Sequence, residues 1–246
     1  MKTTGDRILN KSLTEIGGKG LFVKELDMAL LEGKIDLAVH SLKDMPMEES
    51  EELPILAYGK REDPRDVLIY KPGCSDFPEN GCVGTSSKRR ALQIQNIYPA
   101  CRISGIRGNV QTRLKKLEKE AYDGTILAAA GLNRLKMQIL SEKDPKNSGK
   151  EADVRGRIFE TWEMIPAAGQ GILAVQGREG EDAEYLNCVR SPQSRWEALA
   201  ERQFVRTLDG GCNSPAAAYA VISGQQICLT GLFCDEKSGE IGRAHV

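Results

Sequence analysis

A strand-then-helix rhythm repeats three times between residues 82 and 134, and it limits the chain to an α/β fold. Each repeat opens with a short apolar run that ends in small or polar residues. Ser86 or Ser87 can cap a helix over about residues 88–97 after the first run, and Asn109 can cap a helix after the second. Such alternation predicts neighbouring strands in one sheet, with helices packed on it. The three predicted strands are residues 82–85, 102–106 and 125–130.

One or two arginines follow each of these strands. Helix N-termini attract anions through their free N–H groups, and the planar guanidinium fork of arginine suits a carboxylate. Any one of these arginines could be an ordinary surface residue, but their repetition at three equivalent strand ends favours an anion-binding cluster. The residues are Arg89 and Arg90, Arg107 and Arg113, and Arg134.

The stretch IDLAVHSLKDMP, residues 35–46, is the second feature that indicates a site. Its apolar first half predicts a parallel strand that is buried on both faces. Lys43 and Asp44 follow this strand, and Pro46 ends it. Ligands of open α/β sheets bind beyond the carboxyl ends of the strands, so Asp44 is a candidate functional residue. The alternative is that Lys43 and Asp44 belong to an ordinary solvated turn.

The rest of the chain can be assigned more simply. Residues 3–20 are polar and glycine-rich, which is typical of a mobile loop such as a lid, and they contain no P-loop pattern. We expect a domain boundary near residue 60 and a last region from about Ser191. The other predicted elements are a helix at 21–32, a strand at 55–58, a charged linker at 59–66, an exposed polar excursion at 141–157, a strand at 172–175, a helix from Trp196 to Leu208, and a hairpin of strands 216–222 and 227–233.

Cys212 lies in the stretch LDGGCNSP, among residues that give no bulk. A thiol on a glycine-rich loop is better exposed for reaction than one in an apolar run, although a structural role is the alternative. The chain has seven cysteines, and none of them forms a C-x-x-C pair. Neither a disulfide framework nor a zinc site is therefore predicted.

The composition excludes several classes of protein. A chain of 246 residues exceeds the usual size of one domain, so two or three domains are expected. A formal net charge of −1 gives no overall attraction to nucleic acid or to an anionic membrane, and the basic run SSKRR has no aromatic stacking platform. No apolar run approaches the ~20 residues that span a bilayer, and the N-terminus lacks the core of a signal peptide. These features predict a cytoplasmic protein without nucleic-acid or membrane partners.

Eight blocks of sequence closely resemble the hydroxymethylbilane synthase (porphobilinogen deaminase) family, and they occur in the family's order over nearly the whole chain. The blocks are GGKGLFVKEL, DLAVHSLKDMP, KREDPRD, VGTSSKRR, IRGNVQTRL, ILAAAGLNRL, PAAGQG and LDGGCNSP. The resemblance implies an α/β fold of three domains. The first two are similar to two-lobed periplasmic binding proteins, with the active site between them, and the third is a small α+β domain. The implied divisions are residues 1–60 with about 166–187, 61–165, and 190–246.

The resemblance also implies an activity, the tetrapolymerisation of porphobilinogen to hydroxymethylbilane with release of ammonia, in porphyrin and haem biosynthesis. It implies a transferase that works as a cytoplasmic monomer and extends a covalently attached dipyrromethane, without a metal. By resemblance, Cys212 holds this cofactor through a thioether, Asp44 is the catalytic acid, and Lys19 belongs to a flexible loop over the cleft. The residues that match cofactor contacts are Lys43, Thr85, Ser87, Arg89, Arg90, Arg107, Arg113 and Arg134.

The chain departs from the family pattern at both ends. Family members begin with a strand–helix–strand before the glycine-rich loop, whereas Met1 lies almost at that loop. The C-terminal GEIGRAHV stops where the third domain should continue. We therefore expect a truncated synthase. The alternatives are a non-catalytic two-lobed anion-binding module and an inactive fragment of the synthase.

Overall fold

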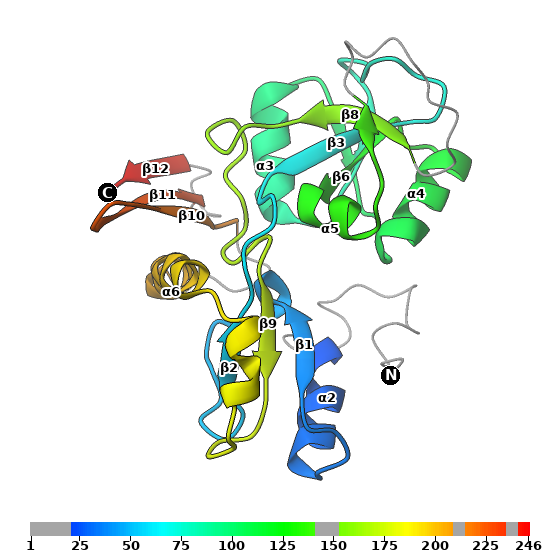
Figure 1. Cartoon of the computed structure of the whole chain (residues 1–246). Helices are drawn as coiled ribbons and strands as arrows, with labels where there is room; N and C mark the ends of the chain where they lie inside the picture. Colours follow the sequence, from blue (N-terminus) through cyan, green and yellow to red (C-terminus); the bar gives the residue numbers. More distant parts are fainter. Residues whose placement is uncertain (1–20, 141–152, 209–214, 235–240) are drawn as a thin grey trace.

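The computed structural model describes residues 21–140, 153–208, 215–234 and 241–246 (Figure 1). These residues form three sheets, which we call the small sheet (order β1-β9-β2), the large sheet (β5-β4-β6-β3-β8-β7) and the C-terminal sheet (β10-β11-β12). The small and large sheets belong to two bodies that meet where the chain crosses between them, and we call this place the junction. The prediction of an α/β fold with two lobes and a third, smaller unit is confirmed.

The large sheet contains the predicted strand-then-helix rhythm. β4 pairs in parallel with β5 and with β6, and a helix follows each of the three strands. Ser87 caps α3 by accepting a hydrogen bond from the backbone N–H of Arg90, and Asn109 caps α4 by accepting one from Thr112. Both predicted caps are therefore confirmed. The elements are β3 (Asp66–Tyr70), β4 (Cys82–Gly84), α3 (Lys88–Ile97), β5 (Arg102–Ser104), α4 (Val110–Lys119), β6 (Gly124–Ala128), α5 (Ala129–Arg134), β7 (Ile139–Leu140) and β8 (Val154–Ile158).

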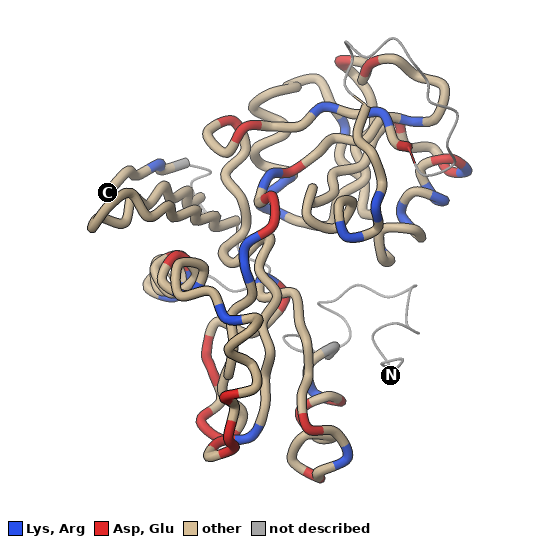
Figure 2. Tube along the Cα trace, viewed as in Figure 1, with Lys and Arg blue, Asp and Glu red and all other residues tan. Residues whose placement is uncertain are grey.

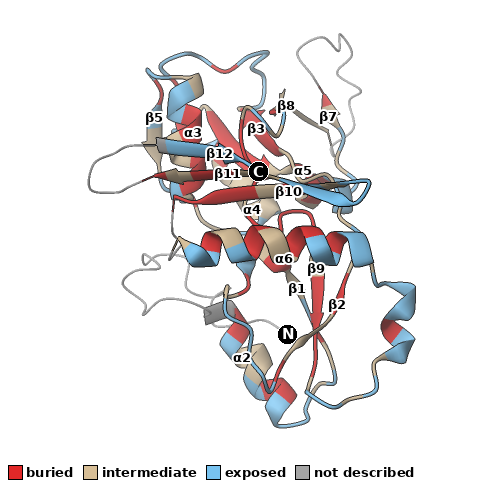
Figure 3. Cartoon of the chain, turned by 90° about the vertical axis from the view of Figure 1, so that its left-hand side faces the viewer, coloured by how far each residue is buried: buried red, intermediate tan, exposed pale blue. Residues whose placement is uncertain are grey.

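Helices cover both faces of the large sheet, so its central strands need no polar alternation. β3 is buried at every position. Val67 and Ile69 pack with Leu117 of α4 on one face, while Leu68 packs with Ile94 of α3 on the other. In Figure 3, β3 is coloured as buried, whereas α3 beside it is partly buried and partly exposed. The two apolar layers hold the carboxyl ends of β4, β5 and β6 at one fixed edge.

Two expectations for the large sheet are wrong. The strand expected at residues 125–130 ends early, because the two alanines that follow β6 begin α5 and are buried. The polar excursion expected at 141–157 includes most of β8, which pairs with β3. Gly156 permits this pairing, since a Cβ there would lie 2.4 Å from the carbonyl oxygen of Leu68. Residues 141–152 lie outside the described part of the chain.

The small sheet corrects the expectation of a buried parallel strand within residues 35–46. β1 (Ala38–Ser41) pairs antiparallel with β9 (Leu173–Gln176), and it forms an edge of the sheet within the described residues. Val39 is 60% exposed, so the apolar run is covered on one face only. The direction of β1 is set by a partner that follows the whole large sheet in the sequence, and no local pattern contains that information. β2 (Ile55–Tyr58) is the other neighbour of β9, and it confirms the strand that the sequence predicts at residues 55–58.

α6 (Pro192–Thr207) packs between the small sheet and the C-terminal sheet. Its Ala198 lies in one apolar cluster with Tyr58 of β2, and its Val205 lies in another with Ala218 of β10. The C-terminal sheet contains the predicted hairpin, whose turn places Gly224 at φ +62°, and β12 adds a strand that was not predicted. The remaining elements are α2 (Leu21–Leu31), η1 (Leu42–Asp44), η2 (Glu184–Cys188), β10 (Ala217–Ser223), β11 (Gln226–Cys234) and β12 (Ile241–His245).

Candidate functional site

Two crossing segments of the chain lie side by side at the junction. Residues 59–65 run from β2 to β3, and residues 159–172 run from β8 to β9. The backbone N–H of Glu62 donates to the carbonyl oxygen of Gly171 at 3.0 Å. Gly171 has φ +90°, and a Cβ there would lie 2.3 Å from the carbonyl oxygen of Glu62, so this approach requires glycine. Figure 2 shows basic and acidic positions close together along this crossing.

A buried carboxylate lies at the edge of the large sheet where the predicted arginines gather. β3 runs antiparallel to β6, which places Asp66, the first residue of β3, opposite Ala128 at the end of β6. Arg89 Nη1 lies 2.8 Å from Asp66 Oδ2, and Arg90 Nη2 donates to Asp66 Oδ1 at 2.7 Å. Burial alone would raise the pKa of this carboxyl. The charges of Arg89 and Arg90 outweigh burial and hold the pKa of Asp66 well below its usual range.

Arg89 and Arg90 are themselves buried and bind groups of the protein. Arg89 also donates to the carbonyl oxygen of Ile165 at 2.7 Å, and Arg90 donates to that of Ile126 at 2.9 Å. The sequence reading placed both arginines at the correct strand end but missed Asp66, which it assigned to a charged linker. The signal that could have identified Asp66 is its position, as a charged residue directly before the apolar run VLIY.

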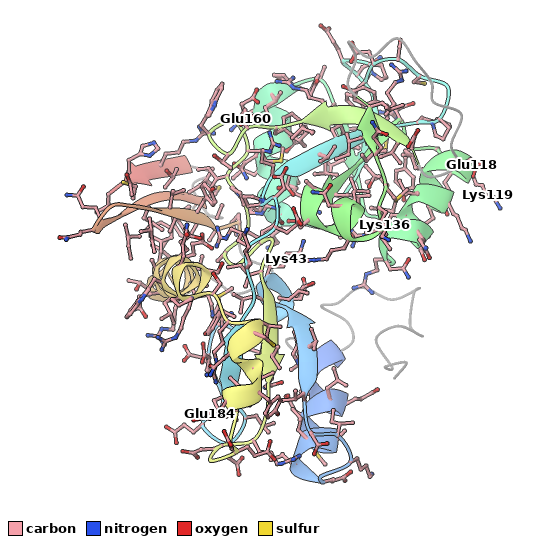
Figure 4. The ribbon with its side chains drawn as sticks, viewed as in Figure 1. Lys43, Glu118, Lys119, Lys136, Glu160 and Glu184 are labelled. Atoms are coloured by element: carbon pink, nitrogen blue, oxygen red, sulfur yellow. The ribbon has the colours of Figure 1, made fainter. Side chains whose placement is uncertain are left out.

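Lys43 comes from the small sheet and reaches the same cluster. It lies on η1, directly after β1, and Figure 4 labels it at the junction. Its Nζ donates to Oε1 of Gln170 at 3.3 Å. Gln170 donates in turn from Nε2 to Asp66 Oδ1 at 2.9 Å and to the carbonyl oxygen of Pro64 at 2.7 Å. Gln170 is 1% exposed, and it is the second residue of the cluster that sequence reasoning did not single out.

The surroundings of Lys43 lower its pKa from an ordinary 10.5 to about 8. Burial is the largest cause, because it disfavours the charged ammonium, and the positive charges of Arg90 and Arg89 act in the same direction. Asp44 and Asp66 oppose the shift. Lys43 is therefore mostly a cation at pH 7, and it loses its charge at a pH only slightly higher.

Asp44 and Arg113 lie within electrostatic reach of each other across the junction. Asp44 is exposed at the end of η1, whereas Arg113 lies on α4 and donates from Nε to the carbonyl oxygen of Gly108 at 2.8 Å. Burial and the charge of Arg90 lower the pKa of Arg113 to about 10, and Asp44 acts against that shift. Among the residues that the structure describes, no carboxylate forms an ion pair with Arg113. Its guanidinium group can therefore bind an external anion.

The other predicted residues lie around this cluster. Thr85 is buried at the end of β4, and its Oγ1 accepts a hydrogen bond from the backbone N–H of Ser87 at 3.2 Å. Arg107 is half-buried in the turn between β5 and α4. Arg134 is exposed, and its Nη2 donates to the carbonyl oxygen of Gly171 at 2.7 Å. Two predicted site residues lie outside the described part of the chain, Cys212 and Lys19.

The junction offers an exposed carboxylate beside several cations, which can bind anionic ligands and exchange protons with them. The His, Cys, Asp and Glu side chains of the described residues form no group of three or more that could hold a metal ion. The helices of the same residues include none with the length and apolar character of a membrane span. The described side chains at the junction supply carboxylate, ammonium and guanidinium groups.

Comparison with known proteins relates nearly the whole chain to one family. Residues 1–186 match the family model "Porphobilinogen deaminase, dipyromethane cofactor binding domain", and residues 196–245 match "Porphobilinogen deaminase, C-terminal domain". The porphobilinogen deaminase of Acetivibrio thermocellus is 52% identical over 241 residues, covering 98% of this chain and 77% of the relative. The porphobilinogen deaminase of Ruminiclostridium josui is 50% identical over 245 residues, with the same two coverages.

Two solved structures show a weaker likeness. Prephenate dehydratase from Arthrobacter aurescens, in complex with L-Phe, has a TM-score of 0.38 and 15% identity, covering 82% of this chain and 66% of that chain. The probable amino-acid ABC transporter extracellular-binding protein ytmK from Bacillus subtilis has a TM-score of 0.35 and 10% identity, covering 75% of this chain and 71% of that chain.

Proposed function

Because the chain belongs to the porphobilinogen deaminase family, we propose that the junction is its active site and that Asp44 is the catalytic acid. The family's reaction is the tetrapolymerisation of porphobilinogen to hydroxymethylbilane with release of ammonia, a transferase step of tetrapyrrole biosynthesis that uses a dipyrromethane cofactor. The observation that carries the proposal is the place of Lys43 and the exposed Asp44 on η1, where Lys43 bonds to Gln170 of the crossing segment and Asp44 acts electrostatically on Arg113. Family membership does not favour a non-catalytic anion-binding module.

The donor groups at the junction fit a ligand that is rich in carboxylates. Every pyrrole unit of the cofactor and substrate carries an acetate and a propionate, so the growing chain brings many negative charges. Arg113 supports this fit because no described carboxylate occupies its guanidinium group, and Lys43 supports it because it is a partly desolvated cation. We assign carboxylate binding first to these two residues. Further contacts are assigned to Thr85, Ser87, Arg89, Arg90, Arg107 and Arg134.

Asp44 has two tasks in the reaction. The dipyrromethane, when bound, supplies a pyrrole whose free α-carbon accepts the next unit. Asp44 gives a proton to the amine that leaves porphobilinogen as ammonia, and it later takes the proton from the pyrrole carbon that has formed the new bond. As a carboxylate it also stabilises the cationic form that the substrate adopts when ammonia leaves. Its exposed place at the end of η1, directly after Lys43, suits both tasks.

The direct test is to supply the purified chain with porphobilinogen and to measure ammonia and hydroxymethylbilane. We expect one ammonia for each porphobilinogen consumed, together with hydroxymethylbilane as the product. Binding of porphobilinogen without any ammonia release would instead support the non-catalytic anion-binding module.

Arg113→Leu should weaken the binding of porphobilinogen without weakening the fold. A hydrogen bond to a charged group contributes about 1.5–3 kcal/mol, so KM should rise about 10- to 100-fold. The melting temperature should stay close to that of the parent, since no ion pair with a described carboxylate is lost. Steady-state kinetics and thermal unfolding measure the two effects. Lys119→Leu is the matched control, because Lys119 is exposed on the same helix and points away from the junction (Figure 4). An unchanged KM for Arg113→Leu would remove Arg113 from the site.

Cys212→Ser should fold normally and carry no covalent pyrrole, because a hydroxyl is a much poorer nucleophile than a thiolate and the family resemblance assigns the thioether to Cys212. The intact mass of the purified parent and variant measures the difference. Cys228→Ser, which changes an exposed cysteine of β11, is the control and should keep the adduct. An adduct of the same mass on another cysteine of the Cys212→Ser protein would show that the assignment is wrong.

The same proposal includes the organisation and location of the protein. We divide the chain into domains at 1–60 with about 166–187, at 61–165 and at 190–246, and we propose a cytoplasmic monomer that binds no nucleic acid. The three sheets support this division, because each draws its strands from one of these three parts. Light scattering after size-exclusion chromatography tests the monomer, and limited proteolysis near residues 60 and 190 tests the division.

A further inference from the structure

The buried carboxylate of Asp66 contacts two adjacent arginines and a glutamine. Its side chain is fully buried, with Oδ2 2.8 Å from Arg89 Nη1. Its Oδ1 accepts hydrogen bonds from Arg90 Nε at 3.1 Å, from Arg90 Nη2 at 2.7 Å and from Gln170 Nε2 at 2.9 Å. Neither the sequence motifs nor the proposed mechanism gives this residue a task.

We propose that Asp66 is a positioning residue of the anion site, which fixes the guanidinium groups of Arg89 and Arg90 and, through Gln170, aligns Lys43 with them. This inference rests on the proposed function of the junction. Two buried guanidinium groups on consecutive residues repel each other, and a carboxylate between them offsets that repulsion. One carboxylate between two guanidinium groups also leaves an excess of positive charge, which the carboxylate of a ligand can neutralise.

Gln170 carries the effect of Asp66 across the junction. Its Nε2 already donates to Asp66 and to the carbonyl oxygen of Pro64, which leaves Oε1 to accept from Lys43. Without the carboxylate of Asp66, one of the two acceptors that orient this amide is lost. The glycines on either side have φ of +75° and +90°, so the backbone at Gln170 is held in a tight turn while its side chain is held by Asp66. Asp66 on the large sheet thus fixes a cation that comes from the small sheet.

The titration of Lys43 reports this arrangement independently of catalysis. Among the described residues, the charged groups that act most on Lys43 are Asp44 on its own short helix, Arg89 and Arg90 on α3, and Asp66 on β3. Asp66 favours the charged ammonium, so a variant without the Asp66 charge should lose the proton of Lys43 at lower pH. A role of Asp66 in packing alone would not produce this shift.

The experiment measures the rate at which acetic anhydride labels Lys43 between pH 6 and pH 11, read from the Lys43 peptide by mass spectrometry. The whole chain is used as the parent and with the changes Asp66→Asn, Asp66→Glu and Asp63→Asn. The last is the control, because Asp63 lies three residues before Asp66 but pairs with Arg65. We expect the labelling rate of Lys43 to reach half its maximum near pH 8 in the parent and in the control. In Asp66→Asn the midpoint should fall by about one pH unit, a shift that removal of one nearby charge in a partly buried site produces.

Binding of porphobilinogen to the same proteins completes the test. Asp66→Asn should bind about tenfold more weakly, since a charge-assisted hydrogen bond in the cluster is lost. A parent midpoint near that of exposed lysines, or an Asp66→Asn protein with unchanged midpoint and binding, would overturn the proposal. If Asp66→Asn does not fold, the Asp66→Glu variant provides the test. It should keep the labelling midpoint of Lys43 and raise KM, with kcat little changed. An unchanged KM in this variant would overturn the proposal. Failure of the proposed function gives a different result, because the parent then releases no ammonia while Lys43 still titrates with the shift described.

Discussion

Asp44→Asn should lower the turnover of porphobilinogen by at least about 10²–10⁴-fold, the usual contribution of general acid–base catalysis, while the fold stays intact. A carboxamide has nearly the size of a carboxylate, and Asp44 is exposed at the end of η1, so its replacement disturbs no packing. The change removes both the group that carries the proton and the negative charge that faces the cationic form of the substrate. Binding should survive, because Lys43 and Arg113 hold the carboxylates of the ligand.

The rate of ammonia release in a single turnover measures this prediction. Asp44→Glu should keep part of the activity, since the charge and the proton are retained and displaced by one methylene. Glu48→Gln is the matched control, because Glu48 is another exposed carboxylate of the segment that follows η1 and pairs only loosely with Arg206, at 3.7 Å. If Asp44→Asn released ammonia as fast as Glu48→Gln, Asp44 would be a turn residue and the active site would have to lie elsewhere.

The parts of the fold that the sequence predicted well are those with a local physical cause. The caps of α3 and α4 depend on Ser87 and Asn109, which bind N–H groups three residues away. The hairpin of β10 and β11 depends on a two-residue turn with a glycine at positive φ. The direction of β1 was predicted wrongly, because its antiparallel partner β9 is distant in the sequence and the apolar run at 35–39 is compatible with either direction.

The candidate site shows the same limit. The arginines were predicted at one edge of the large sheet, because the carboxyl ends of parallel strands necessarily meet there. Sequence reasoning could not show that Arg89 and Arg90 bind an internal carboxylate while Arg113 has no such partner among the described residues. That distinction depends on Asp66, the first residue of β3, and on Gln170, which lies in the crossing segment 159–172. Their proximity is a property of the assembled junction and of no single motif.

A second buried carboxylate, Glu201 on α6, joins the two crossing segments to the C-terminal sheet and gives the largest expected effect on stability. It is fully buried, and its two oxygens accept from Arg61 Nη1 at 2.7 Å and from Arg61 Nη2 at 2.9 Å. It also accepts from the backbone N–H of Gly169 at 2.7 Å and from that of Ala220 at 2.8 Å. One side chain thus holds both crossing segments of the junction and the C-terminal sheet.

Glu201→Gln should lower the free energy of unfolding by about 3–5 kcal/mol, the usual cost of removing one partner from a buried ion pair. Glutamine keeps an oxygen for one of the two backbone N–H groups, which bind different oxygens of Glu201. It turns an amide toward Arg61, whose side chain is 10% exposed and then keeps only the more distant carboxylate of Glu197, 3.6 Å from Arg61 Nε. Urea-induced unfolding measures the loss. Glu160→Gln is the control, because Glu160 pairs with Arg65 at 2.9 Å on the surface, where such a pair contributes only about 0–1 kcal/mol.

The double change Arg61→Met with Glu201→Gln distinguishes the ion pair from the packing around it. Removing both charges should recover part of the loss, since neither member of the Arg61–Glu201 pair is then buried without the other, although Glu197 loses its contact of 3.6 Å with Arg61. The recovery should be incomplete, because Arg61 also stacks on Tyr219, with its guanidinium carbon 5.4 Å from the ring centroid. A double variant no more stable than Glu201→Gln would mean that the loss comes from packing alone. Equal stability of Glu201→Gln and Glu160→Gln would show that the junction is held by its backbone contacts, such as that of Glu62 with Gly171, without help from this carboxylate.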